Sequence, residues 1–245
     1  MSDPLLIISI AFNKDYLISA QVSLIAKNLK DPHRFVVVDN SSQNFRSSIA
    51  RAAGTAYIPS PLQAPSSPSQ SHGQCMNWAY KNVVLPSSCR YFGFVDHDVL
   101  PTGATTIVNK FKNGFVGVVA FRGEKWYLWP GFCFYDRDVI GRRTEMDFRP
   151  YTNFSNPTQN MDTGSSNWDI LYRKMKPIGT TVWCRPLAMR ERQEQPQLDT
   201  AFLFALQPEE YNWIHFCNGS GWFPDRAGDV PKQVLIEEYL KKVER

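Results

Sequence analysis

Long apolar runs are missing from this sequence of 245 residues. The longest, Leu5–Phe12 and Phe115–Phe121, are far shorter than the ~20 residues that a membrane-spanning helix needs. The chain begins Met-Ser-Asp-Pro, without the basic start and the small-residue cleavage site of a signal peptide. We therefore expect no transmembrane segment and a cytoplasmic protein.

Paired cysteines and a strong charge excess are missing as well. No C-x-x-C pair occurs, which argues against a structural zinc site, and we expect reduced, mostly buried thiols. The formal net charge is only +4, and Lys and Arg are spread along the chain, so the sequence lacks the basic patch of a nucleic-acid-binding protein. The five cysteines are Cys75, Cys89, Cys133, Cys184 and Cys217.

The residues that are present are those of a folded α/β protein. Hydrophobic residues make up 43% and charged residues 20% of the chain, which is enough apolar material for a sizeable core. Strand and helix patterns alternate over the first hundred residues, and this rhythm predicts a mostly parallel sheet with helices on both faces. The predicted strands are Leu5–Ala11, Arg34–Val38, Thr55–Ile58 and Tyr91–Val95, and the predicted helices are Lys14–Leu29, Phe45–Ala53 and Gly73–Val84.

Two parts of the chain depart from this rhythm. Pro59–Ser71 carries four prolines among serines, so we expect a surface loop, either a plain insertion or a border of the active site. The second half is less regular. Its patterns predict strands near Phe115–Phe121, Tyr127–Tyr135 and Thr180–Cys184, and helices at Asp162–Met175 and Pro231–Val243.

Polar clusters follow three of the predicted strands. They are Asn13, the run Asp39-Asn40-Ser41-Ser42, and Asp96-His97-Asp98. Ligands of open α/β sheets bind beyond the carboxyl ends of the strands, and parallel strands bring these ends to one edge. We therefore expect the three clusters to share one rim.

Asp96 and Asp98 are the centre of the functional hypothesis. Two carboxylates this close repel each other unless a divalent cation neutralises them. Mg²⁺ and Mn²⁺ prefer oxygen ligands and complete their shell with diphosphate oxygens. The plain alternative is a solvated turn, where Asp is common.

Three segments resemble the GT-A glycosyltransferases, in particular those of the family 2 type. They are Ile7–Asn13 (IISIAFN), Phe35–Ser42 (FVVVDNSS) and Tyr91–Pro101 (YFGFVDHDVLP), all within about the first 100 residues. The resemblance implies a GT-A-like fold in which Asn13 and Asp39 hold the nucleotide. It also implies that Asp96 lies towards the ribose or the metal and that Asp98 is the principal metal ligand.

Two histidines and a tryptophan extend this resemblance. Ser71–Asn82 looks like the family's nucleotide-facing helix, and His72 is expected at its N-terminus, where free backbone N–H groups attract phosphate, although helix capping explains it equally well. His215 looks like the late histidine that completes the metal shell in many GT-A enzymes, and its alternative is a core histidine. Trp222 is expected to pack on the nucleotide or sugar, or on the core.

The catalytic base and the acceptor site follow with more alternatives. Asp162, ahead of a predicted helix, stands where the family's base often does, while a plain helix cap is its rival and Glu145 and Asp147 are in reserve. In the aromatic run Glu124–Tyr135, Trp126 and Trp129 are predicted to bind the acceptor, with part of the run in the core.

The sequence thus predicts a single GT-A-like domain with a nucleotide-binding half (1–101) and an acceptor-binding half (102–245). The expected activity is transfer of a sugar from a nucleoside-diphosphate sugar, of the UDP or GDP type, to a glycan or other hydroxyl acceptor. Transfer is expected to depend on Mn²⁺ or Mg²⁺ and to invert the anomeric centre, because Asp162 offers a base. Retention, or a non-catalytic glycan-binding module on the same fold, are the alternatives.

Overall fold

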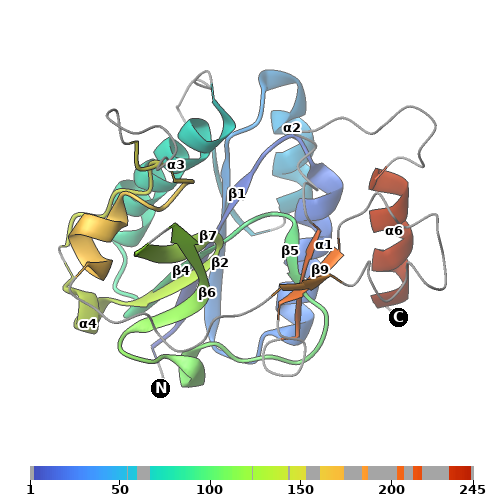
Figure 1. Ribbon diagram of the computed structural model, residues 1–245. Helices are drawn as coiled ribbons and strands as arrows, with labels where there is room; N and C mark the ends of the chain where they lie inside the picture. The colour runs from blue at the N-terminus through green and yellow to red at the C-terminus, as the bar shows by residue number, and fades with distance from the viewer. Residues whose placement is uncertain are drawn as a thin grey trace.

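A six-stranded sheet forms the centre of the protein (Figure 1). In this computed structural model the described residues are 3–53, 55–59, 67–122, 124–142, 144–152, 161–173, 184–186, 203–206, 212–216 and 232–243. The strand order is β3-β2-β1-β4-β7-β6, in which the first four strands pair in parallel and β7 runs antiparallel to both of its neighbours, β4 and β6. The strands are β1 (Leu5–Ala11), β2 (His33–Asp39), β3 (Ala56–Pro59), β4 (Tyr91–Val95), β6 (Phe115–Arg122) and β7 (Lys125–Asp136).

Helices cover both faces of this sheet, as the sequence predicts. Side chains of β1 alternate between the faces, because successive residues of a strand point to opposite sides. Leu6 and Ile8 pack with Met76 of α3, and Leu5 and Ile7 pack with Ile18 of α1. The covering helices are α1 (Asp15–Asn28), α2 (Gln43–Ala53) and α3 (Pro68–Ala79), which continues into a π-helical turn at Tyr80–Val84.

A second, smaller sheet stands beside the first. Its order is β5-β10-β9-β8, all antiparallel, and its strands are β5 (Val99–Pro101), β10 (Trp213–Phe216), β9 (Leu203–Leu206) and β8 (Cys184–Pro186). Only three residues separate the end of β4 from the start of β5, so the polar turn at Asp96-His97-Asp98 is the direct link between the two sheets.

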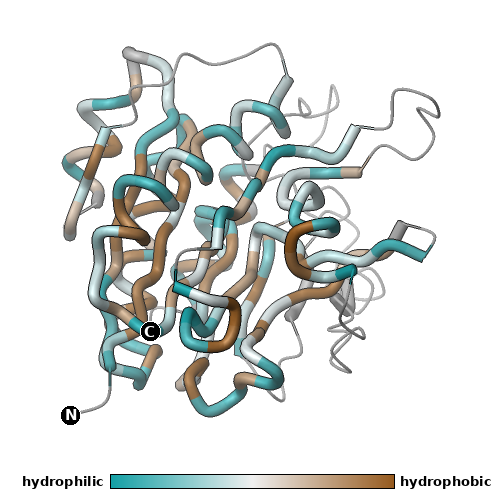
Figure 2. Tube along the Cα trace, turned by 90° about the vertical axis from the view of Figure 1, so that its left-hand side faces the viewer, coloured by the Kyte–Doolittle hydropathy of each residue, from teal (hydrophilic) through white to brown (hydrophobic). Residues whose placement is uncertain are grey.

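The small sheet and the last helix share one apolar cluster with α1. Leu17 and Leu24 of α1 pack with Ile214 of β10 and with Ile236 of α6 (Lys232–Val243). α1 is therefore apolar on two sides, one towards each sheet. Figure 2 shows that hydrophobic stretches of the chain lie mainly in the interior of the molecule. No helix within the described ranges is both long and apolar enough to cross a membrane.

One predicted helix begins later than expected. The sequence predicts a helix at Asp162–Met175, but residues 163–166 form turns, and the helical part begins at Asn167 and continues as a π-helical turn at Trp168–Tyr172. Lys174 and Met175 lie outside the described residues. The backbone N–H groups of Gly164 and Ser166 donate to the carbonyls of Phe148 and Arg149 instead of to their own turn. These non-local bonds outweigh the local helical pattern.

The buried cysteines fit the expected reduced state. Cys75, Cys89 and Cys133 are free and buried, and the side chains of Cys184 and Cys217 lie outside the described part of the structure.

The sheet centre provides a test of the packing. Gly93 of β4 faces the ring of Phe134, and a Cβ at Gly93 would lie 2.0 Å from Phe134 Cδ1 and 2.6 Å from the Cys133 carbonyl oxygen. We predict that Gly93→Ala lowers the free energy of unfolding by about 1–3 kcal/mol, because overpacking forces a backbone shift. Urea denaturation measures it. Gly103→Ala is the control, since its new Cβ would meet only the side chain of Asn212, at 3.3 Å; equal losses in the two variants would contradict the prediction.

Candidate functional site

The polar clusters that follow β1, β2 and β4 lie on one edge of the central sheet. β1 pairs in parallel with β2, where Ala11 faces Asp39, and with β4, so the three strands end at the same edge. Asn40 Nδ2 donates to Ser71 Oγ of α3 at 2.9 Å, which draws that helix to the same place. This edge is called the rim below. It comprises residues 13, 39–42, 71–72 and 96–98.

Asn13 joins the ends of β1 and β2. Its backbone N–H donates to Ser41 Oγ at 2.8 Å, and its Oδ1 accepts from the backbone N–H of Ser42 at 3.0 Å. Its φ of 52° lies in the left-handed region, which Asn tolerates better than most residues. Asn13 therefore braces the two loops, and its amide nitrogen remains for other partners.

Asp39 is enclosed by its neighbours. The residue is 0% exposed, its Oδ1 accepts from the Ser41 backbone N–H at 2.8 Å, and its Oδ2 accepts from the Tyr57 hydroxyl at 2.7 Å. Burial, together with the hydrogen bond and the charge of Asp39, raises the pKa of Tyr57, so this hydroxyl stays a donor at neutral pH. Both oxygens of Asp39 therefore already have a donor within the protein, and a nucleotide that contacts this carboxylate has to share it with Ser41 and Tyr57.

The turn that carries the two central carboxylates is fixed from beneath. Gln21 of α1, which is buried, donates from Nε2 to the carbonyls of Asp96 and Val99, both at 2.8 Å. The ring of His97 points inward, with Nδ1 3.0 Å from the carbonyl oxygen of Ile10. His97 is thus a support of the turn, while the side chains on either side of it face the rim.

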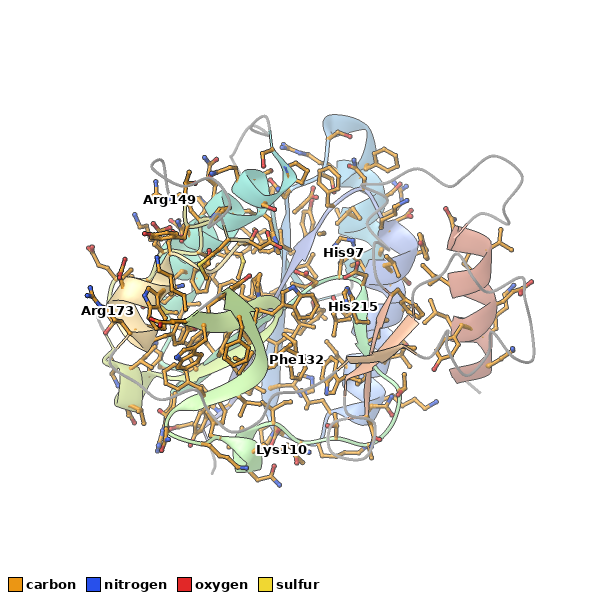
Figure 3. The ribbon with its side chains drawn as sticks, viewed as in Figure 1. His97, Lys110, Phe132, Arg149, Arg173 and His215 are labelled. Atoms are coloured by element: carbon orange, nitrogen blue, oxygen red, sulfur yellow. The ribbon has the colours of Figure 1, made fainter. Side chains whose placement is uncertain are left out.

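The small sheet brings His215 to Asp98. His215 pairs with Val99 in the β10–β5 ladder, and the N–H of Phe216 donates to the carbonyl of Asp98 at 2.9 Å. In consequence His215 Nε2 lies 3.7 Å from Asp98 Oδ1, and both side chains are mostly buried. Figure 3 labels His215, on β10, and His97, on the turn before β5.

His72 pairs with the other carboxylate. Its Nε2 lies 3.2 Å from Asp96 Oδ1. Burial lowers the pKa of His72, but the charge of Asp96 and the hydrogen bond to it outweigh burial, and the pKa is raised. Burial in turn raises the pKa of Asp96, and His72 outweighs it, so that this pKa is lowered. Both shifts have one geometric cause, the close contact between the imidazole of His72 and the carboxylate of Asp96.

The reason given for His72 from the sequence needs correction. α3 begins at Pro68, so His72 lies in the second turn of the helix and not at its N-terminus. Its backbone N–H is therefore not among the free groups that would attract phosphate. The imidazole of His72, which faces Asp96, is the part of this residue that belongs to the rim.

Asp98 and His215 face each other and are residue types that bind divalent cations. Their facing atoms, 3.7 Å apart, are too distant for a hydrogen bond to each other. Neighbouring ligands of an octahedral ion with bonds of about 2.1 Å lie about 3 Å apart, so a small shift of either side chain would bring both within reach of one ion. Among the described residues no group of three or more His, Cys, Asp or Glu side chains is arranged to hold a metal. A cation here would need further ligands from outside the protein, and hard cations take these from phosphates and water.

Asp162 is hydrogen-bonded to the first turn of α3. The residue is exposed, and its Oδ1 accepts from Ser69 Oγ, in the first turn of α3, and from the N–H of Thr163, both at 2.7 Å. Its negative charge contributes to the raised pKa of His72, and so does that of Asp98. Ser69 lies one helical turn before His72 on α3, so Asp162 approaches the same face of this helix as His72.

The two tryptophans predicted to bind the acceptor are placed differently. Trp126 is 2% exposed and packs on Tyr172, with ring centroids 4.6 Å apart, so it offers no surface to an acceptor. Trp129 is half-buried, and its ring centroid lies 4.7 Å from that of His215. Trp222 lies outside the described residues.

Sequence reasoning missed two residues of this site. Gln21 falls on the apolar stripe of α1 between Leu17 and Leu24, and a polar residue at such a position is a signal of a buried hydrogen-bond role. Tyr57 carried no signal, because an aromatic residue in a short strand is ordinary.

Comparisons with known proteins give structural matches only. No family model and no curated protein matches the chain. Among solved structures, the fold matches the mannosyltransferase PcManGT from Pyrobaculum calidifontis, in complex with GDP-Man and Mn²⁺, with a TM-score of 0.42 and 14% identity, over 60% of this chain and 48% of that one. It also matches an active-site mutant of LgtC (TM-score 0.38, 15% identity, 57% and 60% covered) and TarS of S. aureus (0.31, 18%, 42% and 18%).

These neighbours are glycosyltransferases, the class that the sequence resembles. The chain spans about half the length of PcManGT. At these TM-scores the likeness carries no argument about activity. The functional argument therefore rests on the rim itself.

The hydrogen bond from Tyr57 to Asp39 provides a test of the rim. We predict that Tyr57→Phe lowers the free energy of unfolding by about 1–3 kcal/mol, because it leaves a buried carboxylate oxygen without its donor. Chemical denaturation at neutral pH measures this. Tyr91→Phe is the matched control, since the Tyr91 hydroxyl makes no hydrogen bond to another described residue and its ring packs on Phe111. A Tyr57→Phe protein as stable as the control would show that this hydrogen bond is not maintained.

Proposed function

We propose that this protein is a glycosyltransferase that transfers a sugar from a nucleoside-diphosphate sugar to a hydroxyl group of a glycan or another acceptor, with the help of Mn²⁺ or Mg²⁺. The single observation that carries the proposal is that Asp98, on the rim with Asp96 and Asn13, faces His215 of β10. The donor is expected to be of the UDP or GDP type.

The proposal gives each residue of the rim one task. Asp98 and His215 hold the cation, which stabilises the negative charge that develops on the departing diphosphate. Asp96, oriented by His72, faces the ribose or the cation, and Asn13 and Asp39 contact the nucleotide. Residues 1–101 then form the nucleotide-binding half and residues 102–245 the acceptor-binding half, with Trp129 near the boundary.

Asp162 takes the proton of the acceptor in this proposal. An inverting transfer needs a carboxylate that removes this proton while the hydroxyl attacks the anomeric carbon. Asp162 is exposed, and hydrogen bonds from Ser69 and Thr163 orient its carboxylate. Its reserve, Asp147, is occupied by Asn77 and by an ion pair with Arg149, which makes it the weaker candidate.

The metal pair yields a direct test. We predict that Mn²⁺ together with UDP, GDP or the matching sugar nucleotide raises the melting temperature by roughly 5–10 °C at 100 times the Kd, because about 2.7 kcal/mol of binding free energy is added. In Asp98→Asn the Mn²⁺-dependent part of this rise disappears, since a neutral amide is a poor ligand for a hard cation. Differential scanning fluorimetry, with and without EDTA, measures it.

Asp169→Asn is the control for this change. Asp169 is an exposed carboxylate whose only described ion pair, with Arg173, is weak at 3.8 Å, so the same substitution there leaves the shift intact. A wild-type protein that gains nothing from Mn²⁺ with any of these nucleotides would rule out the proposed function.

The role of Asp162 needs a kinetic test. We predict that Asp162→Asn keeps the Mn²⁺-dependent rise in melting temperature but slows Mn²⁺-dependent hydrolysis of the sugar nucleotide by about 10²–10⁴-fold, because water then lacks its base. Asp147→Asn is the comparison and retains the wild-type rate. NMR of the product decides the stereochemistry: an anomeric configuration unchanged from the donor would remove Asp162 from this role, and no hydrolysis by the wild type would favour a non-catalytic binding module.

A further inference from the structure

Trp129 is carried to the rim by an irregularity in β7. The β6–β7 ladder pairs Gly117 with Cys133 and then Val119 with Leu128, so residues 129–132 of β7 stand opposite a single residue of β6. Such a bulge detaches a strand locally and re-aims its side chains, and bulges are common beside active sites. Pro130, which has no N–H to donate, fits within it.

The bulge is also hydrogen-bonded to the turn at residues 96–98. The N–H of Asp96 donates to the carbonyl of Gly131 at 3.0 Å. Gly131 has a second role, because a Cβ at this position would lie 2.2 Å from Cη2 and Cζ2 of Trp129. Any larger residue at position 131 would therefore push the indole of Trp129 away from β7, the strand whose Gly131 carbonyl accepts the hydrogen bond from Asp96.

The indole in turn contacts the ring of His215. The ring centroids are 4.7 Å apart and the planes are tilted by 47°, which is within the range of favourable aromatic contacts. His215 has its Nε2 towards Asp98. Gly131, Trp129 and His215 therefore form one continuous path from the backbone of Asp96 to the carboxylate of Asp98.

We infer that Trp129 is a positioning residue: its indole, seated on Gly131, holds the imidazole of His215 in the orientation that faces Asp98. The inference rests on the proposed function, and it replaces the predicted acceptor contact of Trp129 with a role in metal binding. Trp129 acts through His215 and does not touch the cation. Residues that orient a metal ligand through a hydrogen bond change metal affinity by about 10–100-fold when they are removed, and we expect an effect of the same order from this ring contact.

A double-mutant cycle tests the path. The measured quantity is the dissociation constant of Mn²⁺, by titration calorimetry and by the EPR signal of free Mn²⁺, in the presence of whichever of UDP or GDP raises the melting temperature. We expect Trp129→Ala to weaken Mn²⁺ binding at least 10-fold in the wild-type background and to change it less than 2-fold in His215→Ala, because the two residues act as one unit.

Three more variants separate orientation from stability. Gly131→Ala, which displaces the indole without removing it, is expected to weaken Mn²⁺ binding as Trp129→Ala does. Trp129→Phe keeps an aromatic ring there and restores most of the affinity. Trp126→Phe, in the core of the same strand, lowers the melting temperature without a change in Mn²⁺ affinity. In protein without metal, the ring-current shift of the His215 imidazole protons disappears in Trp129→Ala and persists in Trp129→Phe.

Each other outcome overturns the inference. An equal loss of affinity from Trp129→Ala in both backgrounds means that the indole acts on the ligand directly, as an acceptor or nucleotide contact would. No loss in either background means that His215 is oriented without it. These results leave the proposed function standing, whereas a wild-type protein that binds no Mn²⁺ with either nucleotide removes both.

Discussion

The geometry of the rim depends on one short turn, residues 96–98, whose backbone is held by hydrogen bonds to uncharged groups. Two carboxylates two residues apart repel each other, so the turn cannot be held by the attraction of its own side chains. The central sheet holds it at the N–H of Asp96, the small sheet at the carbonyl of Asp98, and Gln21 from below. Because these bonds use the backbone, the acidic side chains are left for the rim, and the two sheets are fixed relative to each other by the same residues.

The sequence predicted the parallel part of the fold and the rim because local signals are strong there. Leu5–Ala11 and Tyr91–Val95 are continuous apolar runs, as strands covered on both faces must be, and the structure has strands at the same residues. Polar residues directly after such runs fall at the strand ends. Once these strands are parallel, their meeting at one edge follows without any knowledge of side-chain contacts.

The rest of the site comes from pairings between residues far apart in the chain, which local patterns do not encode. The register of β10 on β5 decides that His215 faces Asp98, and a shift by one residue would turn it away. A turn at residues 163–166 replaces the first part of a predicted helix, because the N–H groups of Gly164 and Ser166 donate to the carbonyls of residues 148–149. Trp126 lies in the core and Trp129 lies beside His215. The difference comes from a bulge in β7, which is visible only in the pairing of β6 with β7.

The different partners of Asp96 and Asp98 bear on how the two carboxylates divide their work. Asp96 is committed to His72 through a contact of 3.2 Å, which fixes one of its oxygens and leaves the other for a ligand. Asp98 Oδ1 lies 3.7 Å from His215 Nε2, which is too far for a hydrogen bond between these two atoms. Asp96 would have to loosen its contact with His72 to offer both oxygens to a cation, whereas Asp98 has no such close contact with His215. Under the proposed function this difference favours Asp98 as the principal metal ligand, and it suits Asp96 to a neutral ribose hydroxyl, from which its second oxygen can accept a hydrogen bond while His72 stays in place.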